Sequence, residues 1–281
     1  MASGDTRLAG VIGWPVAHSL SPALHQAAFD AAGFDAVSVA LPVEAPALPR
    51  ALESLATMDA LGVSVTMPHK QAVAALATSV DPLVERLGAA NCLTFANGSI
   101  HASSTDGRGF LDALVEAVGF DPRGARCVVL GAGGAAAAIV VALADAGANV
   151  AVVARNQPAA EDTVRLAGGD TAVGQMVDVA SAALIVNATP LGMEGTPFAA
   201  DLAIDDPASL HEGQVVFDTI YHPRRTPLLT AAAAAGARPV GGLAMLVHQA
   251  RHQLEGWLGS PVDPEVLWQA VGGRRGEDAT W

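Results

Sequence analysis

The chain has 281 residues, of which 51% are hydrophobic and 15% are charged, and its formal net charge is −13. This length is enough for two ordinary domains with their own cores, and the apolar content excludes an intrinsically disordered chain. The acidic balance excludes a protein that binds nucleic acid or an anionic membrane surface, since both need a basic face. We therefore expect a globular protein with neither nucleic acid nor membrane among its partners.

The N-terminus and the cysteines predict the compartment. Residues 1–5 lack a basic stretch followed by an apolar core, so we expect no signal peptide. No apolar run reaches the roughly 20 residues that span a bilayer. Cys92 and Cys127 fall in expected strands without the spacing of a metal or redox site. These features together predict a reducing, cytoplasmic location.

The first part of the chain alternates expected strands and helices, which predicts an α/β domain with mixed strand directions. Its last two strands flank Asn97-Gly98, a sequence typical of a type I′ hairpin. The expected strands are residues 7–12, 37–41, 61–65, 91–95 and 99–103, and the expected helices are residues 23–32, 45–56 and 108–118.

Two hydroxyl side chains precede the first expected helix. Ser21 is placed at the N-cap and Pro22 at the first helical position, with Ser19 two residues earlier. Capping alone explains this pattern. Two hydroxyls at a helix N-terminus also form a small anion site that suits a carboxylate.

Further polar residues follow the third and fifth expected strands. Pro68 is expected to open a helix, with Lys70 one turn in, at a strand-to-helix corner where α/β proteins bind ligands. The alternative for Lys70 is an ordinary surface lysine. Asp106 precedes the helix at 108–118, and its spacing alone favours an N-cap.

The second part of the chain predicts a doubly wound parallel sheet after the turn-rich residues 121–124. The expected strands are residues 126–130, 149–153, 171–174, 183–187, 215–219 and 238–240. Polar residues follow two of these strands, at 187–190 and at 218–221, and a long helix is expected over residues 243–258.

The strand at 126–130 leads into a glycine-rich turn. Gly131, Gly133 and Ala136 have the G-x-G-x-x-A spacing of a dinucleotide-binding turn, in which a pyrophosphate lies at a helix N-terminus. Arg155 follows the next strand, where an acidic residue would bind a ribose 2′-OH and an arginine suits a 2′-phosphate. NADP is therefore favoured. The alternative is an ordinary α/β turn with a solvated arginine.

A metal site is not expected. His248 and His252 stand four residues apart, but no glutamate lies between them in the HExxH manner and no third ligand is evident.

Taken together, these motifs resemble those of the shikimate/quinate dehydrogenase family, over about residues 11–267. One such motif by chance is unremarkable, whereas eight in the family's order are specific. They are Gly13-Trp14-Pro15 with residues 18–22, residues 65–70, Gly88-Ala89-Ala90-Asn91, Ser104-Thr105-Asp106, residues 131–135, residues 187–193, residues 218–221 and residues 242–249.

The resemblance implies an α/β fold with two domains. The substrate domain would comprise residues 1–106 and 243–281, with the C-terminal helices packing back on its N-terminal part. A Rossmann-type NADP domain would occupy residues 107–242. The resemblance implies an oxidoreductase that catalyses the reversible NADPH-dependent reduction of 3-dehydroshikimate to shikimate in aromatic amino acid biosynthesis. It also implies a monomer or a homodimer.

The resemblance also implies roles for individual residues. Lys70 would be the general acid/base and Asp106 its partner. The substrate-binding residues would be Ser19, Ser21, Thr66, Asn91, Asp106, Tyr221 and Gln249. The cofactor-binding residues would be Gly131, Ala132, Gly133, Gly134, Ala135, Ala154, Arg155, Asn156, Thr219 and Gly242.

Two departures from the family pattern leave alternatives open. Ser64 and Ser104 stand where relatives often have asparagine, and Ala154-Arg155-Asn156 replaces the usual Asn-Arg-Thr. A paralogue acting on quinate or an amino analogue, possibly with NAD, is the first alternative. A non-catalytic dinucleotide sensor is the second, and the presence of Lys70 and Asp106 argues against it.

Overall fold

The computed structural model describes residues 3–276, and the chain forms two compact units. The first unit comprises Met1–Thr105 and Gln249–Arg274, and the second comprises Asp106–His248 and Arg275–Trp281. Helix α9 (Gly242–Leu258) therefore begins in the second unit and ends in the first. Relative to the boundaries expected after residues 106 and 242, this division places Asp106, residues 243–248 of α9 and residues 275–276 in the second unit. Residues 277–281 of the expected segment 243–281 lie outside the described residues.

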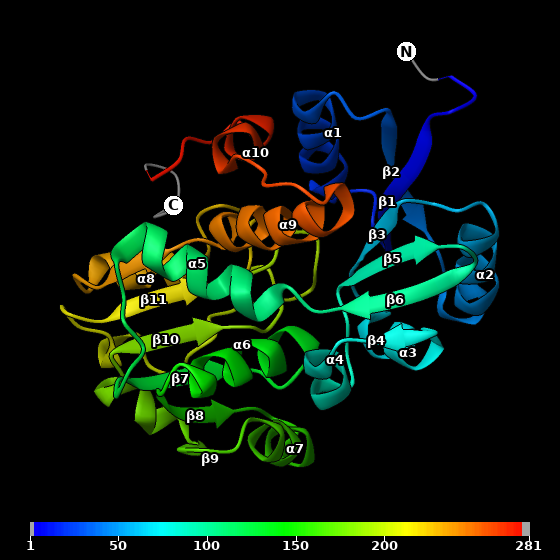
Figure 1. Cartoon of the computed structure of the whole chain (residues 1–281). Coiled ribbons are helices and arrows are strands. Elements are labelled where there is room, and N and C mark those ends of the chain that lie inside the picture. Colours follow the sequence, from blue (N-terminus) through cyan, green and yellow to red (C-terminus); the bar gives the residue numbers. More distant parts are fainter. Residues whose placement is uncertain (1–2, 277–281) are drawn as a thin grey trace. The chain divides into compact units, whose positions relative to one another are not determined.

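The first unit is built on a six-stranded mixed sheet in the order β2-β1-β3-β5-β6-β4. Strands β1, β2 and β3 are parallel, while β5 runs antiparallel to both β3 and β6 (Figure 1). Its strands are β1 (Arg7–Gly13), β2 (Ala36–Pro42), β3 (Gly62–Val65), β4 (Ser79–Val80), β5 (Cys92–Ala96) and β6 (Ser99–Ser103). Its helices are α1 (Ser21–Ala32), the short η1 (Ala45–Ala47), α2 (Leu48–Thr57), α3 (Lys70–Leu76), α4 (Pro82–Leu87) and α10 (Pro264–Ala270), together with the end of α9.

The mixed strand directions and the hairpin agree with the sequence. Asn97 and Gly98 both have positive φ, at 51° and 75°, as a type I′ turn requires. One face of the sheet buries apolar residues of α2 and of the strands, among them Leu52, Val63 and Leu93. Helix α10 packs against α1, so the C-terminal segment does return to the first unit.

The second unit is built on a six-stranded sheet in the order β12-β11-β10-β7-β8-β9, and each described pairing is parallel. Its strands are β7 (Arg126–Leu130), β8 (Asn149–Val153), β9 (Thr171–Val173), β10 (Leu184–Asn187), β11 (Val215–Asp218) and β12 (Arg238–Val240). Its helices are α5 (Asp106–Val118), α6 (Gly134–Asp145), α7 (Gln157–Ala167), η2 (Met176–Ser181), η3 (Pro207–Ser209), α8 (Pro227–Ala234) and the start of α9.

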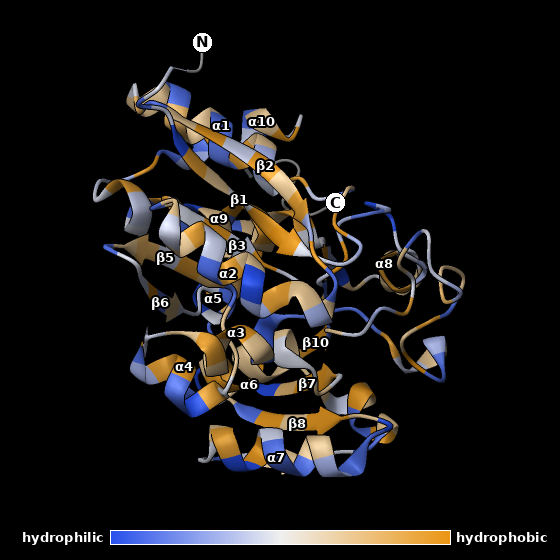
Figure 2. Ribbon diagram, turned by 90° about the vertical axis from the view of Figure 1, so that its right-hand side faces the viewer, coloured by the Kyte–Doolittle hydropathy of each residue, from blue (hydrophilic) through white to orange (hydrophobic). Residues whose placement is uncertain are grey.

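This is the doubly wound order of a Rossmann fold, in which the chain reverses direction across the sheet between β7 and β10. Apolar residues of strands β7, β10 and β11 form the core with α8, including Val128, Ile185 and Leu229. Figure 2 shows strand β8 mainly in hydrophobic colours, whereas α7 carries both colours along its length. The expected fold class is confirmed.

Three local expectations are wrong. Helix α1 begins at Ser21, and its N-cap is Leu20 without a side-chain hydrogen bond, so Ser21 is not the cap. Helix α3 begins at Lys70 with His69 as its N-cap, and Pro68 follows a cis peptide bond; Lys70 is therefore the first helical residue, not one turn in. Asp106 is likewise the first residue of α5, not the residue before it.

Candidate active site

The carboxyl ends of the parallel strands β1 and β3 form one edge of the first unit's sheet. Thr66 follows β3, and its backbone N–H donates to Ile12 of β1 at 3.0 Å. The two segments approach so closely that a Cβ on Gly13 would lie 2.4 Å from Cγ2 of Thr66. A glycine at this position therefore allows the Thr66 side chain to lie against the end of β1.

Lys70 and Asn91 are held at the same edge. The backbone N–H of Val65 donates to the carbonyl of Asn91 at 2.8 Å, and that of Ala90 donates to the carbonyl of Lys70 at 2.8 Å. Lys70 is half-buried and Asn91 is buried. The first unit thus brings Thr66, Lys70 and Asn91 together on neighbouring backbone segments.

Gln249 of α9 joins this group through side-chain hydrogen bonds. Nδ2 of Asn91 donates to Oε1 of Gln249 at 3.2 Å, and the hydroxyl of Thr105 donates to the backbone carbonyl of Gln249 at 3.1 Å. Three of the expected substrate-binding residues therefore share one edge of the first unit with Lys70.

Ser19 and Ser21 lie at the start of α1. Ser21 is 5% exposed and donates its backbone N–H to Oγ of Ser19 at 3.3 Å. The first N–H groups of any α-helix lack acceptors within the helix, and no side chain caps this one. The two hydroxyls and the helix N-terminus together can bind an anion.

The glycine-rich turn lies between β7 and α6 of the second unit, beside the switch point of the sheet. Gly131 has φ 115°, and its N–H donates to the carbonyl of Val153 at 2.8 Å. A Cβ on Gly131 would lie 2.9 Å from the carbonyl oxygen of Ala188, whereas one on Gly133 would meet open space. No side chain caps α6, whose twelve residues begin at Gly134. An uncapped helix N-terminus with open space beside Gly133 fits a dinucleotide pyrophosphate.

The end of β8 lies beside this turn. Ala154 is half-buried and Arg155 is exposed, while Oδ1 of Asn156 caps α7 by accepting from the N–H of Ala159 at 3.2 Å. The expected cofactor contact of Asn156 therefore comes in addition to a structural role. The guanidinium of Arg155 is accessible for a phosphate group.

Asp218 organises the ends of β10 and β11. It is fully buried, and its carboxylate accepts hydrogen bonds from Nδ2 of Asn187 at 3.0 Å, from the N–H of Ile220 at 3.1 Å and from the hydroxyl of Thr226 at 2.7 Å. Burial raises the pKa of Asp218 to about 6, although the hydrogen bonds from these three donors oppose the shift.

Three expected site residues follow β11 and β12. A Cβ on Gly242 would lie 2.3 Å from the carbonyl oxygen of Thr219, so only glycine permits α9 to start so close to Thr219. Tyr221 is half-buried, and burial raises the pKa of its hydroxyl, which therefore stays protonated at neutral pH. Asp106 is also in the second unit, buried at the start of α5.

The two cysteines lie buried. Burial raises the pKa of Cys92 and of Cys127 to about 12, so neither thiol is a nucleophile at neutral pH. Among residues 3–276, no cluster of three or more His, Cys, Asp or Glu side chains could hold a metal ion. Within that same part of the chain no helix has the length and hydrophobicity to cross a membrane.

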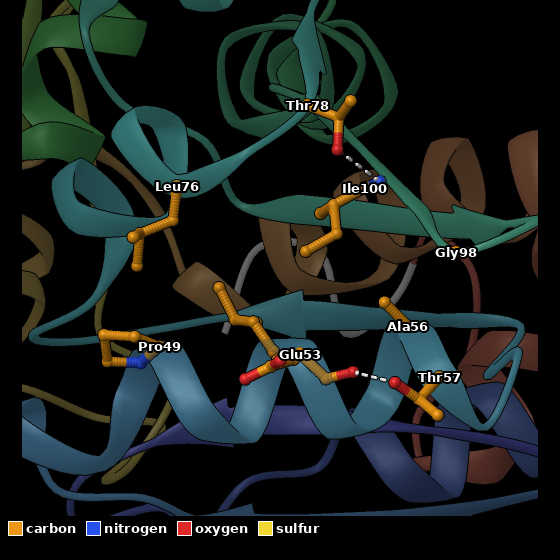
Figure 3. Close-up of a pocket in the computed structure, with 9 residues that line it drawn as sticks. Pro49, Glu53, Ala56, Thr57, Leu76, Thr78, Gly98 and Ile100 are labelled. Atoms are coloured by element: carbon orange, nitrogen blue, oxygen red, sulfur yellow. Dashed lines mark hydrogen bonds between the residues drawn. The ribbon is translucent and has the colours of Figure 1, made fainter.

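A shallow groove of about 270 Å³ also lies on the first unit, between α2, α3 and β6 (Figure 3). Its lining is largely aliphatic, from Leu52, Leu76 and Ile100. The hydroxyl oxygen of Thr78 accepts a hydrogen bond from the backbone N–H of Ile100 at 3.1 Å. None of the expected site residues lines it, so it plays no part in the candidate site.

Three buried polar residues, His25, Ser64 and Gln253, form a hydrogen-bonded chain that leads to Gln249. In the sequence only Ser64 is marked, as a departure from the family pattern, and His25 and Gln253 are not predicted. Oε1 of Gln249 also accepts from Nε2 of Gln253 at 2.9 Å, and Gln253 in turn bonds to Ser64, which bonds to His25. The spacing of Gln249 and Gln253, one helical turn apart, is a further signal of this arrangement in the sequence. His25 and Ser64 are too distant in sequence to be paired with them.

A mixed α/β unit and a Rossmann unit with a glycine-rich turn place this chain among the dinucleotide-binding α/β proteins. Residues 11–93 match the family described as shikimate dehydrogenase substrate binding domain, and residues 118–194 match a putative NAD(P)-binding family. A shikimate dehydrogenase (NADP(+)) from Methanopyrus kandleri is 41% identical over 281 residues, covering 95% of each chain. The chain belongs to the shikimate dehydrogenase family.

Solved structures agree with this assignment. Shikimate 5-dehydrogenase from Thermus thermophilus, in complex with NADP(H) and shikimate, has a TM-score of 0.85 and 32% identity, covering 95% of this chain and 99% of that one. Quinate dehydrogenase from Corynebacterium glutamicum, in complex with NAD, has a TM-score of 0.84 and 28% identity, covering 95% and 98%. The fold is thus shared by relatives with different substrates and cofactors.

Proposed function

We propose that this chain catalyses the reversible NADPH-dependent reduction of 3-dehydroshikimate to shikimate. The observation that carries the proposal is the arrangement of Thr66, Lys70, Asn91 and Gln249 at one edge of the first unit's sheet, in a chain 41% identical to a named shikimate dehydrogenase (NADP(+)). Shikimate is a small polyhydroxylated carboxylic acid, and hydroxyl, amide and ammonium groups suit its oxygens.

Lys70 is proposed as the general acid/base, with Asp106 as its partner. During reduction the substrate's carbonyl oxygen gains negative charge, and an ammonium group can donate the proton it needs. In the reverse reaction the neutral amine takes the proton back. A carboxylate partner favours the charged form of the lysine and orients it.

The remaining substrate contacts divide by chemistry. Ser19 and Ser21, at the uncapped start of α1, are proposed to bind the carboxylate. The amides of Asn91 and Gln249 and the hydroxyls of Thr66 and Tyr221 are proposed to bind the remaining oxygen atoms.

NADP is proposed as the cofactor, and when bound it supplies or accepts the hydride. Residues 131–135 would hold the pyrophosphate, and Arg155 the 2′-phosphate. The exposure of Arg155 directly after β8, without an acidic residue at that strand end, supports this choice. Ala154, Asn156, Thr219 and Gly242 complete the proposed cofactor site.

A quinate dehydrogenase that uses NAD is the alternative, supported by the structural likeness to the Corynebacterium glutamicum enzyme. Initial rates with shikimate and with quinate, each with NADP⁺ and with NAD⁺, separate the two. We expect the highest kcat/KM for shikimate with NADP⁺. The highest value for quinate with NAD⁺ would establish the alternative, and no oxidation of either substrate would contradict both.

A further inference from the structure

The first unit contains a continuous chain of hydrogen-bonded polar side chains that passes through Gln249, and its members are buried except for the half-buried Ser38. Its members come from strands, helices and loops that are far apart in sequence, and each is hydrogen-bonded to the next. In order, they are Ser38 of β2, His25 of α1, Ser64 of β3, Gln253 and Gln249 of α9, and Asn91 and Thr105 next to β5 and α5.

A backbone donor fixes the orientation of one end of this chain. The N–H of Thr105 can only donate, and it lies 2.7 Å from Oδ1 of Asn91. The other atom of that amide, Nδ2, therefore faces Gln249 at 3.2 Å as a donor. The atom of Gln249 that receives this bond must be its carbonyl oxygen, Oε1.

A backbone acceptor fixes the next member independently. The carbonyl of Asn91 can only accept, and Nε2 of Gln253 donates to it at 3.0 Å. The second hydrogen of the same nitrogen is directed at Oε1 of Gln249, 2.9 Å away. Oε1 of Gln249 thus accepts two hydrogen bonds, which use both of its lone pairs. Oε1 of Gln253 is left facing the hydroxyl of Ser64, which donates to it.

The donor and acceptor of each hydrogen bond can be assigned in the same way as far as His25. Because the Ser64 hydroxyl donates to Gln253, it accepts from Nε2 of His25 at 3.0 Å. Nδ1 of His25 then accepts from the hydroxyl of Ser38 at 2.8 Å. His25 is fully buried against Trp257, with ring centroids 4.9 Å apart, and burial lowers its pKa to about 3. The ring is therefore neutral, with a single proton on Nε2.

We propose that His25 is a positioning residue for substrate binding: through Ser64 and Gln253 it holds the Gln249 amide so that its N–H group, and not its carbonyl oxygen, is offered to an oxygen acceptor of the substrate. The inference rests on the proposed role of Gln249 as a shikimate ligand. Neither His25, Ser64 nor Gln253 needs to touch the substrate, since each is almost completely buried.

Two measurements test this inference. The first is the tautomer of His25 by ¹⁵N NMR of the histidine rings in the wild-type chain, with the signal identified by comparison with His25→Phe. We expect a neutral ring protonated on Nε2 between about pH 5 and pH 8. A ring protonated on Nδ1 would overturn the hydrogen-bond polarity, whether or not the protein oxidises shikimate.

The second measurement compares Ser64→Ala, which removes the hydroxyl, with Ser64→Thr, which keeps it. We expect KM for shikimate to rise about five- to tenfold in Ser64→Ala and in Gln253→Met, with KM for NADP⁺ unchanged, as for a lost neutral hydrogen bond. Ser64→Thr should stay within about twofold of wild type. The exposed Gln269→Met on α10 is the control for a glutamine lost elsewhere in the first unit.

The outcomes separate this inference from the proposed function. A wild-type enzyme that oxidises shikimate, with an unchanged KM in both Ser64→Ala and Gln253→Met, would overturn the positioning role alone. A wild-type chain that does not oxidise shikimate would contradict the proposed function, and with it the role of Gln249. Equal rises in KM for shikimate and NADP⁺ would indicate general damage to the fold and would also count against positioning.

Discussion

The buried carboxyl of Asp218 makes a quantitative prediction about stability and pH. Its pKa is raised from 3.8 to about 6 by burial, so the folded chain binds this proton more tightly than the unfolded chain does. The corresponding stabilisation is fully present below about pH 3.8 and is lost as the pH rises through about 6. At 1.36 kcal/mol per pKa unit, the loss amounts to roughly 3 kcal/mol.

The test compares wild type with Asp218→Asn, which keeps the shape of the side chain but cannot ionise. Urea unfolding followed by circular dichroism at several pH values gives the free energy of unfolding of each. Between about pH 4.5 and pH 7.5, the wild-type value minus the variant value should fall by about 2 kcal/mol, because other carboxyls titrate equally in both. The exposed Asp205→Asn is the control, and its difference should stay within about 0.5 kcal/mol. A constant difference for Asp218→Asn would refute the reasoning.

Three further predictions concern the proposed site. Lys70→Ala should lower kcat by about 10²–10⁴-fold, and its effect should be far from additive with that of Asp106→Asn; near-normal turnover with a raised KM would make Lys70 a binding residue only. Arg155→Ala should weaken kcat/KM with NADP⁺ by about ten- to a hundredfold and leave NAD⁺ nearly unaffected, whereas equal losses would point to a structural role. Ser21→Ala should raise KM for shikimate with little loss of stability, since Ser21 does not cap α1, and an unchanged KM in the Ser19→Ala, Ser21→Ala double variant would remove the carboxylate site.

Most of the fold is readable from the sequence because apolar runs, glycines and prolines act locally. The strands of the Rossmann unit and the glycine-rich turn at Gly131 appear within a few residues of their expected positions. The two-residue β4 and the six-residue α4 were not expected, since neither is long enough to have a clear hydrophobic period.

The errors arise where local residue preferences do not decide the structure. The N-caps of α1 and α3 are Leu20 and His69, which are not among the residue types preferred at helix N-caps. The hydrogen bonds of Ser64 to His25 and to Gln253 join residues 39 and 189 positions apart. From the sequence, Ser64 is notable only because it departs from the family pattern. In the structure its hydroxyl is hydrogen-bonded to two buried side chains, those of His25 and Gln253.

The first unit is built from two segments of the chain that are separated by residues 106–248, and this has a consequence for its synthesis on the ribosome. Residues 249–274, which carry Gln253 and Trp257, are made only after the whole stretch Asp106–His248. At about 5–20 residues per second, roughly 7–30 s separate the two halves of this unit. During that interval His25 and Ser64 have been translated but their partners on α9 have not. The core of the second unit lies between these two halves in the chain, so it can close first, although the first unit begins earlier.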